Sequence, residues 1–140
     1  MAILNEMVHE VRMIPLDKRS HVSEHIRQWQ GNSVGHWDGD TLVVETRNFT
    51  DKTNFRGSRE NLVLVERFTR LDTDTLIYEF TVEDSSVWTR EWTATVPMVR
   101  NDGQMYEYAC HEGNYGMVGI LAGARADEKV AGAETGTESR

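Results

Sequence analysis

The segment TLIYEFTVE, residues 75–83, decides the fold. Side chains of a β-strand point alternately to its two faces, so residues two apart share a face. Every second position of this segment is apolar, and glutamate or threonine fills most of the positions between. The apolar positions are Leu76, Tyr78, Phe80 and Val82. The pattern predicts an antiparallel strand with one dry face and one solvated face.

Strand-like segments continue on both sides of residues 75–83 and are separated by short polar turns. They are residues 8–16, 34–46, 61–71, 87–99 and 105–112. The tripeptide DGD at Asp38–Asp40 divides residues 34–46 into two strands of a hairpin. The sequence therefore predicts a mainly β fold, in which about seven antiparallel strands form a meander that closes into a barrel or a strongly curved sheet.

Helical signals are confined to two segments. Residues 20–30 favour a short helix or an ordered loop, with Ser20 as a possible N-cap, and a C-terminal helix begins after Asn114. The polar end of the chain, residues 133–140, has the composition of a disordered tail. We expect a single domain over residues 1–132.

Composition excludes several classes of partner. The 140 residues carry a formal net charge of -8 and no block of lysine or arginine, which argues against nucleic acid or an anionic membrane. No apolar run approaches the roughly 20 residues of a membrane span. The first ten residues have neither the basic start nor the apolar centre of a signal peptide. No cofactor motif is present.

Three charged residues interrupt otherwise apolar faces. Glu66 shares its face with Leu64 and Phe68, Arg90 lies between two tryptophans, and Glu112 follows an alternating series of tyrosine and cysteine. A buried charge must be paired, hydrated or directed into a cavity. We therefore expect Glu66, Arg90 and Glu112 to meet around a pocket. A structural salt bridge, strand ends that reach solvent, or a shifted strand register would explain the same pattern.

These residues suggest acid–base chemistry by carboxylates. A carboxyl group beside aromatic rings loses solvation and becomes better able to exchange protons. The predicted catalytic residues are Glu112, Glu66 and His36. Tyr78 and Tyr108 are further proton donors, and Arg90 would hold an anionic group. Such a site suits an isomerase, lyase, cyclase or hydrolase that needs no cofactor.

Metal and nucleophile chemistry are less well supported. His21 and His25 are four residues apart, but no second cluster of ligands follows them in the sequence. Cys110 and His111 are adjacent, and adjacent residues of a strand point to opposite faces, so His111 cannot activate Cys110. No metal site is predicted.

The preferred function is binding of a small apolar or aromatic molecule in the cavity. Its predicted ligand-binding residues are Arg90, Tyr78, Tyr108, Trp88 and Trp92. A binder should show ionisable groups paired to each other in an apolar pocket, whereas an enzyme should show an unpaired carboxylate with a donor opposite. A third alternative is a structural subunit that forms a homo-oligomer through an open strand edge.

The motifs GHWDGDTLVV at residues 35–44 and CHE at residues 110–112 resemble a family of bacterial secreted or periplasmic β-rich proteins. That family shares a G-x-W-x-G-D-T-L-V-V core and a closing C-x-E motif, and the resemblance covers roughly residues 4–126. It implies a β-rich fold and a periplasmic or secreted location, and no particular activity. Gly35 and Trp37 are also similar to the G-x-W start of lipocalin-like barrels.

Overall fold

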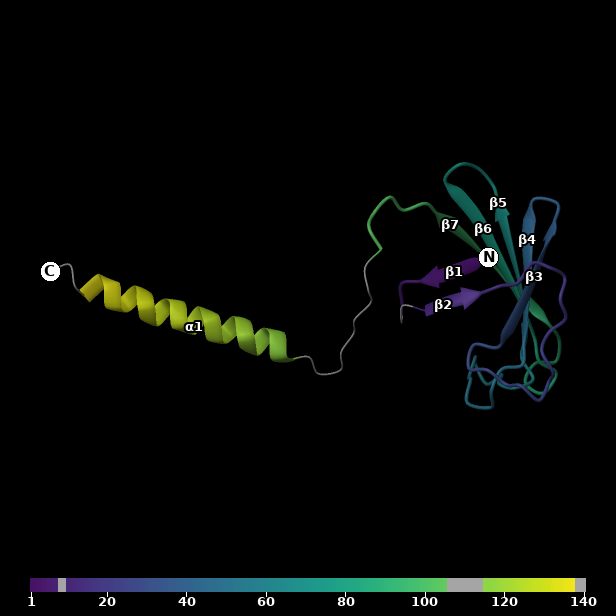
Figure 1. The fold of residues 1–140 in the computed structure, drawn as a ribbon, viewed down its shortest axis with the longest axis horizontal. Coiled ribbons are helices and arrows are strands. Elements are labelled where there is room, and N and C mark those ends of the chain that lie inside the picture. Colours follow the sequence, from purple (N-terminus) through teal and green to yellow (C-terminus); the bar gives the residue numbers. More distant parts are fainter. Residues whose placement is uncertain (8–9, 106–114, 138–140) are drawn as a thin grey trace. The chain divides into compact units, whose positions relative to one another are not determined.

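The computed structural model describes residues 1–7, 10–105 and 115–137 (Figure 1). Two compact units are present, Met1–Glu107 and Tyr108–Arg140. The described elements are β1 (Ala2–Asn5), β2 (Glu10–Met13), β3 (Asn32–Asp38), β4 (Thr41–Arg47), β5 (Val63–Arg70), β6 (Thr75–Glu83), β7 (Trp92–Val99) and α1 (Tyr115–Thr137).

Strands β3 to β7 form one antiparallel sheet in the order of the sequence. This arrangement confirms the predicted mainly β fold and its antiparallel meander. Strand β6 covers the predicted residues 75–83. The barrel is wrong for the described strands, because β3 and β7 are the two edges of the sheet and do not pair with each other.

The turn between β3 and β4 has the predicted hairpin geometry. Asp38 pairs with Thr41, so Gly39 and Asp40 form a two-residue turn. Gly39 has φ 59°, a conformation that glycine adopts without steric cost and that two-residue hairpin turns require. The local sequence is therefore sufficient to set the register of this hairpin.

Strands β1 and β2 pair with each other in a separate two-stranded sheet, the β1–β2 hairpin, where the sequence predicts one strand over residues 8–16. The chain leaves this hairpin through Ile14, which is 1% exposed, and then runs beside β3, where the Gly35 amide donates to the Pro15 carbonyl. A Cβ at Gly35 would lie 2.9 Å from side-chain atoms of both Ile14 and Leu16. Glycine at this position therefore permits the close approach of the two segments.

One face of the five-stranded sheet carries two hydrophobic clusters, as the alternation predicts. We call the first the hairpin cluster; its buried members are Ile14, Leu42 and Val44. We call the second the aromatic cluster; its buried members are Phe49, Leu62 and Val82, and it is extended by Phe55, Leu64, Phe80, Trp88 and Trp92. The strands supply alternate residues to both clusters, and the hairpin and the loop after β4 cover them.

Of the two forms expected for residues 20–30, the short helix is wrong, and the segment is a loop that contains a turn. Side chains of the sheet region hold its backbone and so replace helical hydrogen bonds. The Asn48 amide donates to the Val22 carbonyl over 3.0 Å, and the Val22 amide donates to Asn32 Oδ1 over 3.1 Å. The His21 ring lies between Asn32 Oδ1 and Glu45 Oε1, 3.1 Å from each.

The C-terminal helix is present as α1 and extends to Thr137, into residues 133–140 that the sequence assigns to a tail. Within the described part of the chain, α1 lacks an apolar stretch that would cross a bilayer. Most of the predicted closing strand, residues 106–112, lies outside the described residues, as does the predicted cap Asn114. The single domain over residues 1–132 stays a prediction.

Candidate functional site

Glu66 is the centre of the candidate site. It lies in the middle of β5 on the apolar face of the sheet and is 3% exposed, as its alternation with Leu64 and Phe68 predicts. Arg12 from β2 meets it with both guanidinium ends, Nη1 to Oε2 over 2.7 Å and Nη2 to Oε1 over 3.0 Å. This bidentate geometry fixes the orientation of both side chains. The pair links the β1–β2 hairpin to the five-stranded sheet.

Tyr78 completes this polar group from the neighbouring strand β6. Its hydroxyl donates to Glu66 Oε1 over 2.9 Å. Burial raises the pKa of Tyr78 well above its ordinary value, and the adjacent Glu66 carboxylate raises it further. The phenol therefore keeps its proton at neutral pH and acts as a fixed hydrogen-bond donor. We call Arg12, Glu66 and Tyr78 the polar triad.

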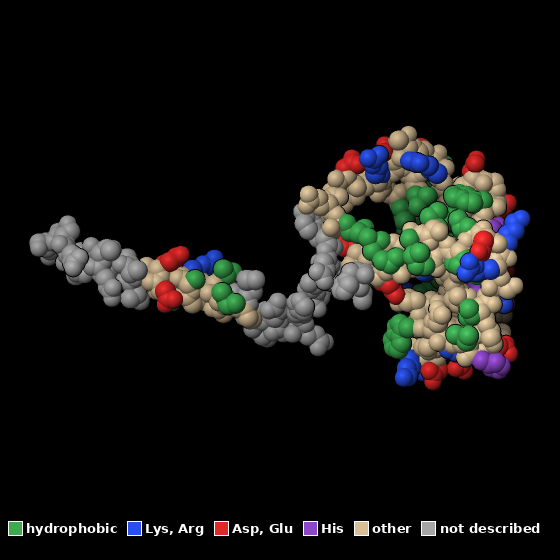
Figure 2. Space-filling model, viewed as in Figure 1, with side chains coloured by type: hydrophobic (Ala, Val, Ile, Leu, Met, Phe, Trp, Pro, Cys, Tyr) green, Lys and Arg blue, Asp and Glu red, His purple; other side chains and the backbone are tan. Residues whose placement is uncertain are grey.

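The polar triad opens onto a cleft of about 620 Å³ between the hairpin and the sheet. Its other lining residues are Met1, Ile3, Leu4, Asn5, Trp37, Asp40, Leu42, Phe68, Arg70, Leu76 and Met98. Most are apolar, and Figure 2 shows hydrophobic side chains around a hollow of this unit. The volume falls in the range of small-molecule sites, roughly 300–1,000 Å³.

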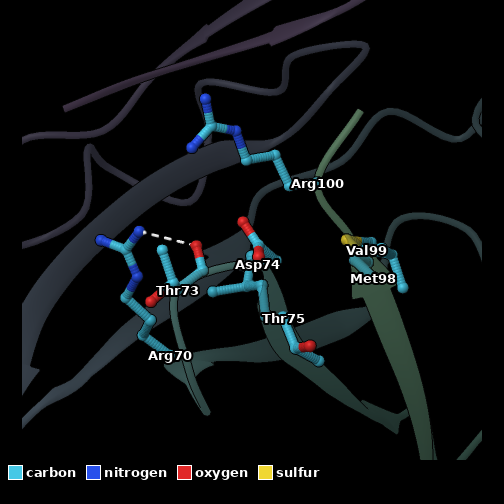
Figure 3. Close-up of a pocket in the computed structure, with 8 residues that line it drawn as sticks. Arg70, Thr73, Asp74, Thr75, Met98, Val99 and Arg100 are labelled. Atoms are coloured by element: carbon cyan, nitrogen blue, oxygen red, sulfur yellow. Dashed lines mark hydrogen bonds between the residues drawn. The ribbon is translucent and has the colours of Figure 1, made fainter. Parts of the chain in front are cut away.

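A smaller hollow of about 360 Å³ adjoins the cleft and shares Arg70, Leu76 and Met98 with it. Arg70 and Arg100 approach it from the end of β5 and from the residue after β7 (Figure 3). The Arg70 guanidinium is bonded to backbone, with Nε 3.2 Å from the Asp72 carbonyl and Nη2 3.1 Å from the Thr73 carbonyl. These bonds hold Arg70 against the β5–β6 turn.

A separate apolar hollow of about 450 Å³ lies in the aromatic cluster. Its lining residues are Phe49, Thr53, Asn54, Phe55, Leu62, Leu64, Tyr78 and Phe80, none of which is charged. Tyr78 lines both this hollow and the cleft, so the ring separates a region that contains an ion pair from one that does not.

The predicted pairing of Glu66 with Arg90 is wrong. Arg12 occupies the carboxylate, and Arg90 is exposed in the segment before β7. The Val87 and Trp88 amides both donate to the Asp84 carbonyl, which turns the chain after β6. The alternation of side chains between the two faces therefore begins only at Trp92, the first residue of β7. The prediction that Arg90 lies on the apolar face assumed that the strand already included Trp88.

Trp88 and Trp92 lie in the aromatic cluster and do not line the cleft. Their ring centroids are 5.6 Å apart at an interplanar angle of 71°. Trp88 Nε1 donates to the buried Ser58 hydroxyl over 3.0 Å. These contacts give both rings a packing role in the described structure.

The other predicted site residues do not join the polar triad. His36 pairs with Val43 across β3 and β4, which places it on the opposite face of the sheet from Glu66, and it is exposed. The expected proximity of His36 and Glu66 is therefore not found. Glu112 and Tyr108 lie outside the described residues.

Arg12 is the residue that sequence reasoning missed. It has the same alternation as the buried Ile14, a signal equivalent to the one that singled out Glu66. Val11 and Met13 obscured this signal, because both are apolar and yet exposed, at 53% and 69%. Within β2, Val11 and Met13 therefore face outward while Arg12 turns inward.

Among the described residues, no group of three or more histidine, cysteine or acidic side chains could hold a metal. Comparisons of the chain with models of known protein families, with curated protein sequences and with solved structures find no match. The geometry of the cleft therefore carries the functional argument.

Proposed function

We propose that the protein binds a small, mostly apolar molecule in the cleft between the β1–β2 hairpin and the sheet. The observation that carries this proposal is that Glu66 is paired with Arg12 and Tyr78 inside a lining that is mostly apolar. Both of its oxygens accept hydrogen bonds, from Arg12 and Tyr78, at 2.7–3.0 Å. A paired charge of this kind fixes the shape of a pocket, and apolar walls supply most of the affinity.

The same pairing argues against Glu66 as a general base. A base must be free to take a proton from the substrate, and its oxygens must lie within hydrogen-bond reach of that proton. The Glu66 carboxylate is neutralised by Arg12, and Tyr78, whose pKa is raised, is a poor source of protons. Binding is therefore favoured over acid–base catalysis, and the curvature of the sheet would serve to shape the cavity.

Fluorescence titration with N-phenyl-1-naphthylamine, a neutral apolar probe, tests the proposal. Leu76→Gln places a polar amide in the lining, and we expect about tenfold weaker binding of the probe. The matched control is Ile77→Gln, since Ile77 is the next residue of β6, is also half-buried, and points to the opposite face.

The control should bind the probe within about twofold of the unmodified protein, because Ile77 lies on the opposite face of the sheet and does not line the cleft. Leu76 does not line the hollow of the aromatic cluster, so its effect assigns the probe to the cleft or to the smaller hollow that adjoins it. Equal affinities of the two variants, or no binding by the unmodified protein, would contradict the proposal.

A further inference from the structure

We infer that the ligand of the cleft is uncharged and carries a hydroxyl group that bonds to the polar triad. This inference rests on the proposed function and adds the chemical class of the ligand. It follows from the charge balance of the lining, from the unused hydrogen-bonding capacity of Arg12 and Glu66, and from the charges at the rim.

The charges of the polar triad cancel. Arg12 contributes one positive charge and Glu66 one negative charge, and Tyr78 remains neutral. A ligand carboxylate bound at the polar triad would be repelled by Glu66, and a ligand ammonium group would be repelled by Arg12. Each would also lose its own hydration on binding. Burial of such an unpaired charge is unfavourable, so the site discriminates against ions of either sign.

The polar triad nevertheless retains capacity for hydrogen bonds. A carboxylate accepts about four, and among the described residues Glu66 accepts three, two at Oε1 and one at Oε2. A guanidinium has five N–H groups, and Arg12 directs only two of them to Glu66. The Arg12 side chain is 20% exposed, so part of it faces the cleft.

A hydroxyl group matches this remaining capacity because it both donates and accepts. It can donate to Glu66 Oε2 and accept from an N–H of Arg12, whereas a carboxylate can only accept and an ammonium group can only donate. A purely apolar ligand would leave these groups without partners, at a cost in affinity.

Asp40 and Arg70 line the cleft with opposite signs, so their charges offset each other. The ammonium group of Met1, a third charge among the lining residues, donates to the Ile14 carbonyl over 2.9 Å. The cleft volume of about 620 Å³ accommodates a body of two fused aromatic rings with a short polar arm. An aromatic alcohol of that size is therefore the simplest molecule that satisfies the walls and the polar triad together.

Displacement of N-phenyl-1-naphthylamine by four naphthalene derivatives at pH 7 tests the inference. They share one body and are 2-naphthalenemethanol, 2-methylnaphthalene, 2-naphthoate and 2-naphthylmethylammonium. We expect the alcohol to bind about tenfold more tightly than the hydrocarbon, since hydrogen bonds to charged groups are the stronger kind. The anion and the cation should bind more weakly than the hydrocarbon.

A variant with an apolar site separates the polar contribution from the apolar one. Arg12→Met, Glu66→Leu and Tyr78→Phe together remove the polar triad and leave no orphaned partner. In this triple variant the alcohol should lose its advantage, while the hydrocarbon still displaces the probe.

The outcomes distinguish the two proposals. If the hydrocarbon matches the alcohol, or if either ion binds as tightly as the alcohol, the inference is overturned while binding of apolar molecules stands. If the unmodified protein does not bind the probe at all, both are overturned. Should the triple variant fail to fold, the ranking of the four compounds on the unmodified protein decides the inference by itself.

Discussion

The hairpin cluster and the aromatic cluster lie on the same face of one sheet, and each borders a hollow, yet only one of the hollows contains charge. The cleft beside the hairpin cluster is lined by Leu42 and by the ion pair of Arg12 and Glu66. In the aromatic cluster, Phe55, Phe80 and Trp92 contact one another with centroids 5.7–6.5 Å apart. The first unit therefore contains one hollow lined by an ion pair and one hollow without charged lining residues.

Under the proposed function, stability and ligand selectivity are supplied by different residues. Aromatic rings bury large apolar areas and stabilise the fold without specifying a ligand. A buried ion pair contributes little net stability, because desolvation offsets the attraction, but it imposes geometry and rejects unmatched charges. We therefore expect substitutions in the aromatic cluster to affect folding first, and substitutions in the cleft to affect binding first.

The largest expected contrast compares Phe49→Ala with Leu76→Ala. Phe49 is 6% exposed in the aromatic cluster, and its truncation should lower the free energy of unfolding by about 4 kcal/mol. Leu76 is only partly buried and borders the cleft, so its truncation should cost about 1 kcal/mol. Urea unfolding followed by tryptophan fluorescence measures both, since Trp29, Trp37, Trp88 and Trp92 all lie in the first unit. Equal losses would show that the two clusters are not distinct.

The next contrast isolates the ion pair. Arg12→Met leaves the buried Glu66 carboxylate without its cation and should reduce the free energy of unfolding by about 3 kcal/mol. The double variant Arg12→Met/Glu66→Leu removes both charges and should recover to within about 1 kcal/mol of the unmodified protein. Arg90→Met is the matched control, an exposed arginine whose loss should change stability little. If Arg90→Met lowers the free energy of unfolding as much as Arg12→Met does, the result would instead support the pairing of Glu66 with Arg90 that the sequence predicts.

The smallest contrast compares Glu66 with Glu45, which also pairs with arginine but lies on the opposite face of the sheet. Partial burial raises the pKa of Glu45, but hydrogen bonds from Arg47 and His21 outweigh it, so the pKa is lowered below its ordinary value. A carboxyl group with a lowered pKa stabilises the fold above its unfolded-state pKa, and this contribution is lost as the pH falls through the folded-state pKa.

Glu45→Gln should therefore reduce stability at pH 7 by less than about 1 kcal/mol, because the pair is solvent-exposed and screened. The difference from the unmodified protein should shrink as the pH falls below about 4. Thermal unfolding measured from pH 7 to pH 3 checks this trend. A difference that grows on acidification would give the opposite sign and contradict the pairing.

Local sequence was sufficient for the strands with regular alternation. Residues 75–83 form β6 with the expected faces, and Asp38–Asp40 mark the β3–β4 hairpin. Glu66 was also recognised from sequence as a charge on an apolar face. These features depend on the two-residue period of a strand and on turn chemistry, which neighbouring residues determine.

The partners of those residues depend on contacts between distant segments. Arg12 and Glu66 are separated by 54 positions, and no local pattern distinguishes Arg12 from Arg90 as the partner. Alternation failed for Arg90 because hydrogen bonds to the Asp84 carbonyl turn the chain before β7 begins. The loop over residues 20–30 was likewise decided by Asn48 and Asn32, whose side chains bind its backbone.

The sequence by itself thus determined which face of each regular strand is apolar and that a carboxylate interrupts it. Only the tertiary structure decided that an arginine from a separate hairpin neutralises that carboxylate and leaves a cleft beside it. The physical reason is the distance along the chain over which each feature is set. Side-chain alternation is a property of a few consecutive residues, whereas the partner of a buried charge depends on which distant segment the fold brings within about 3 Å of it.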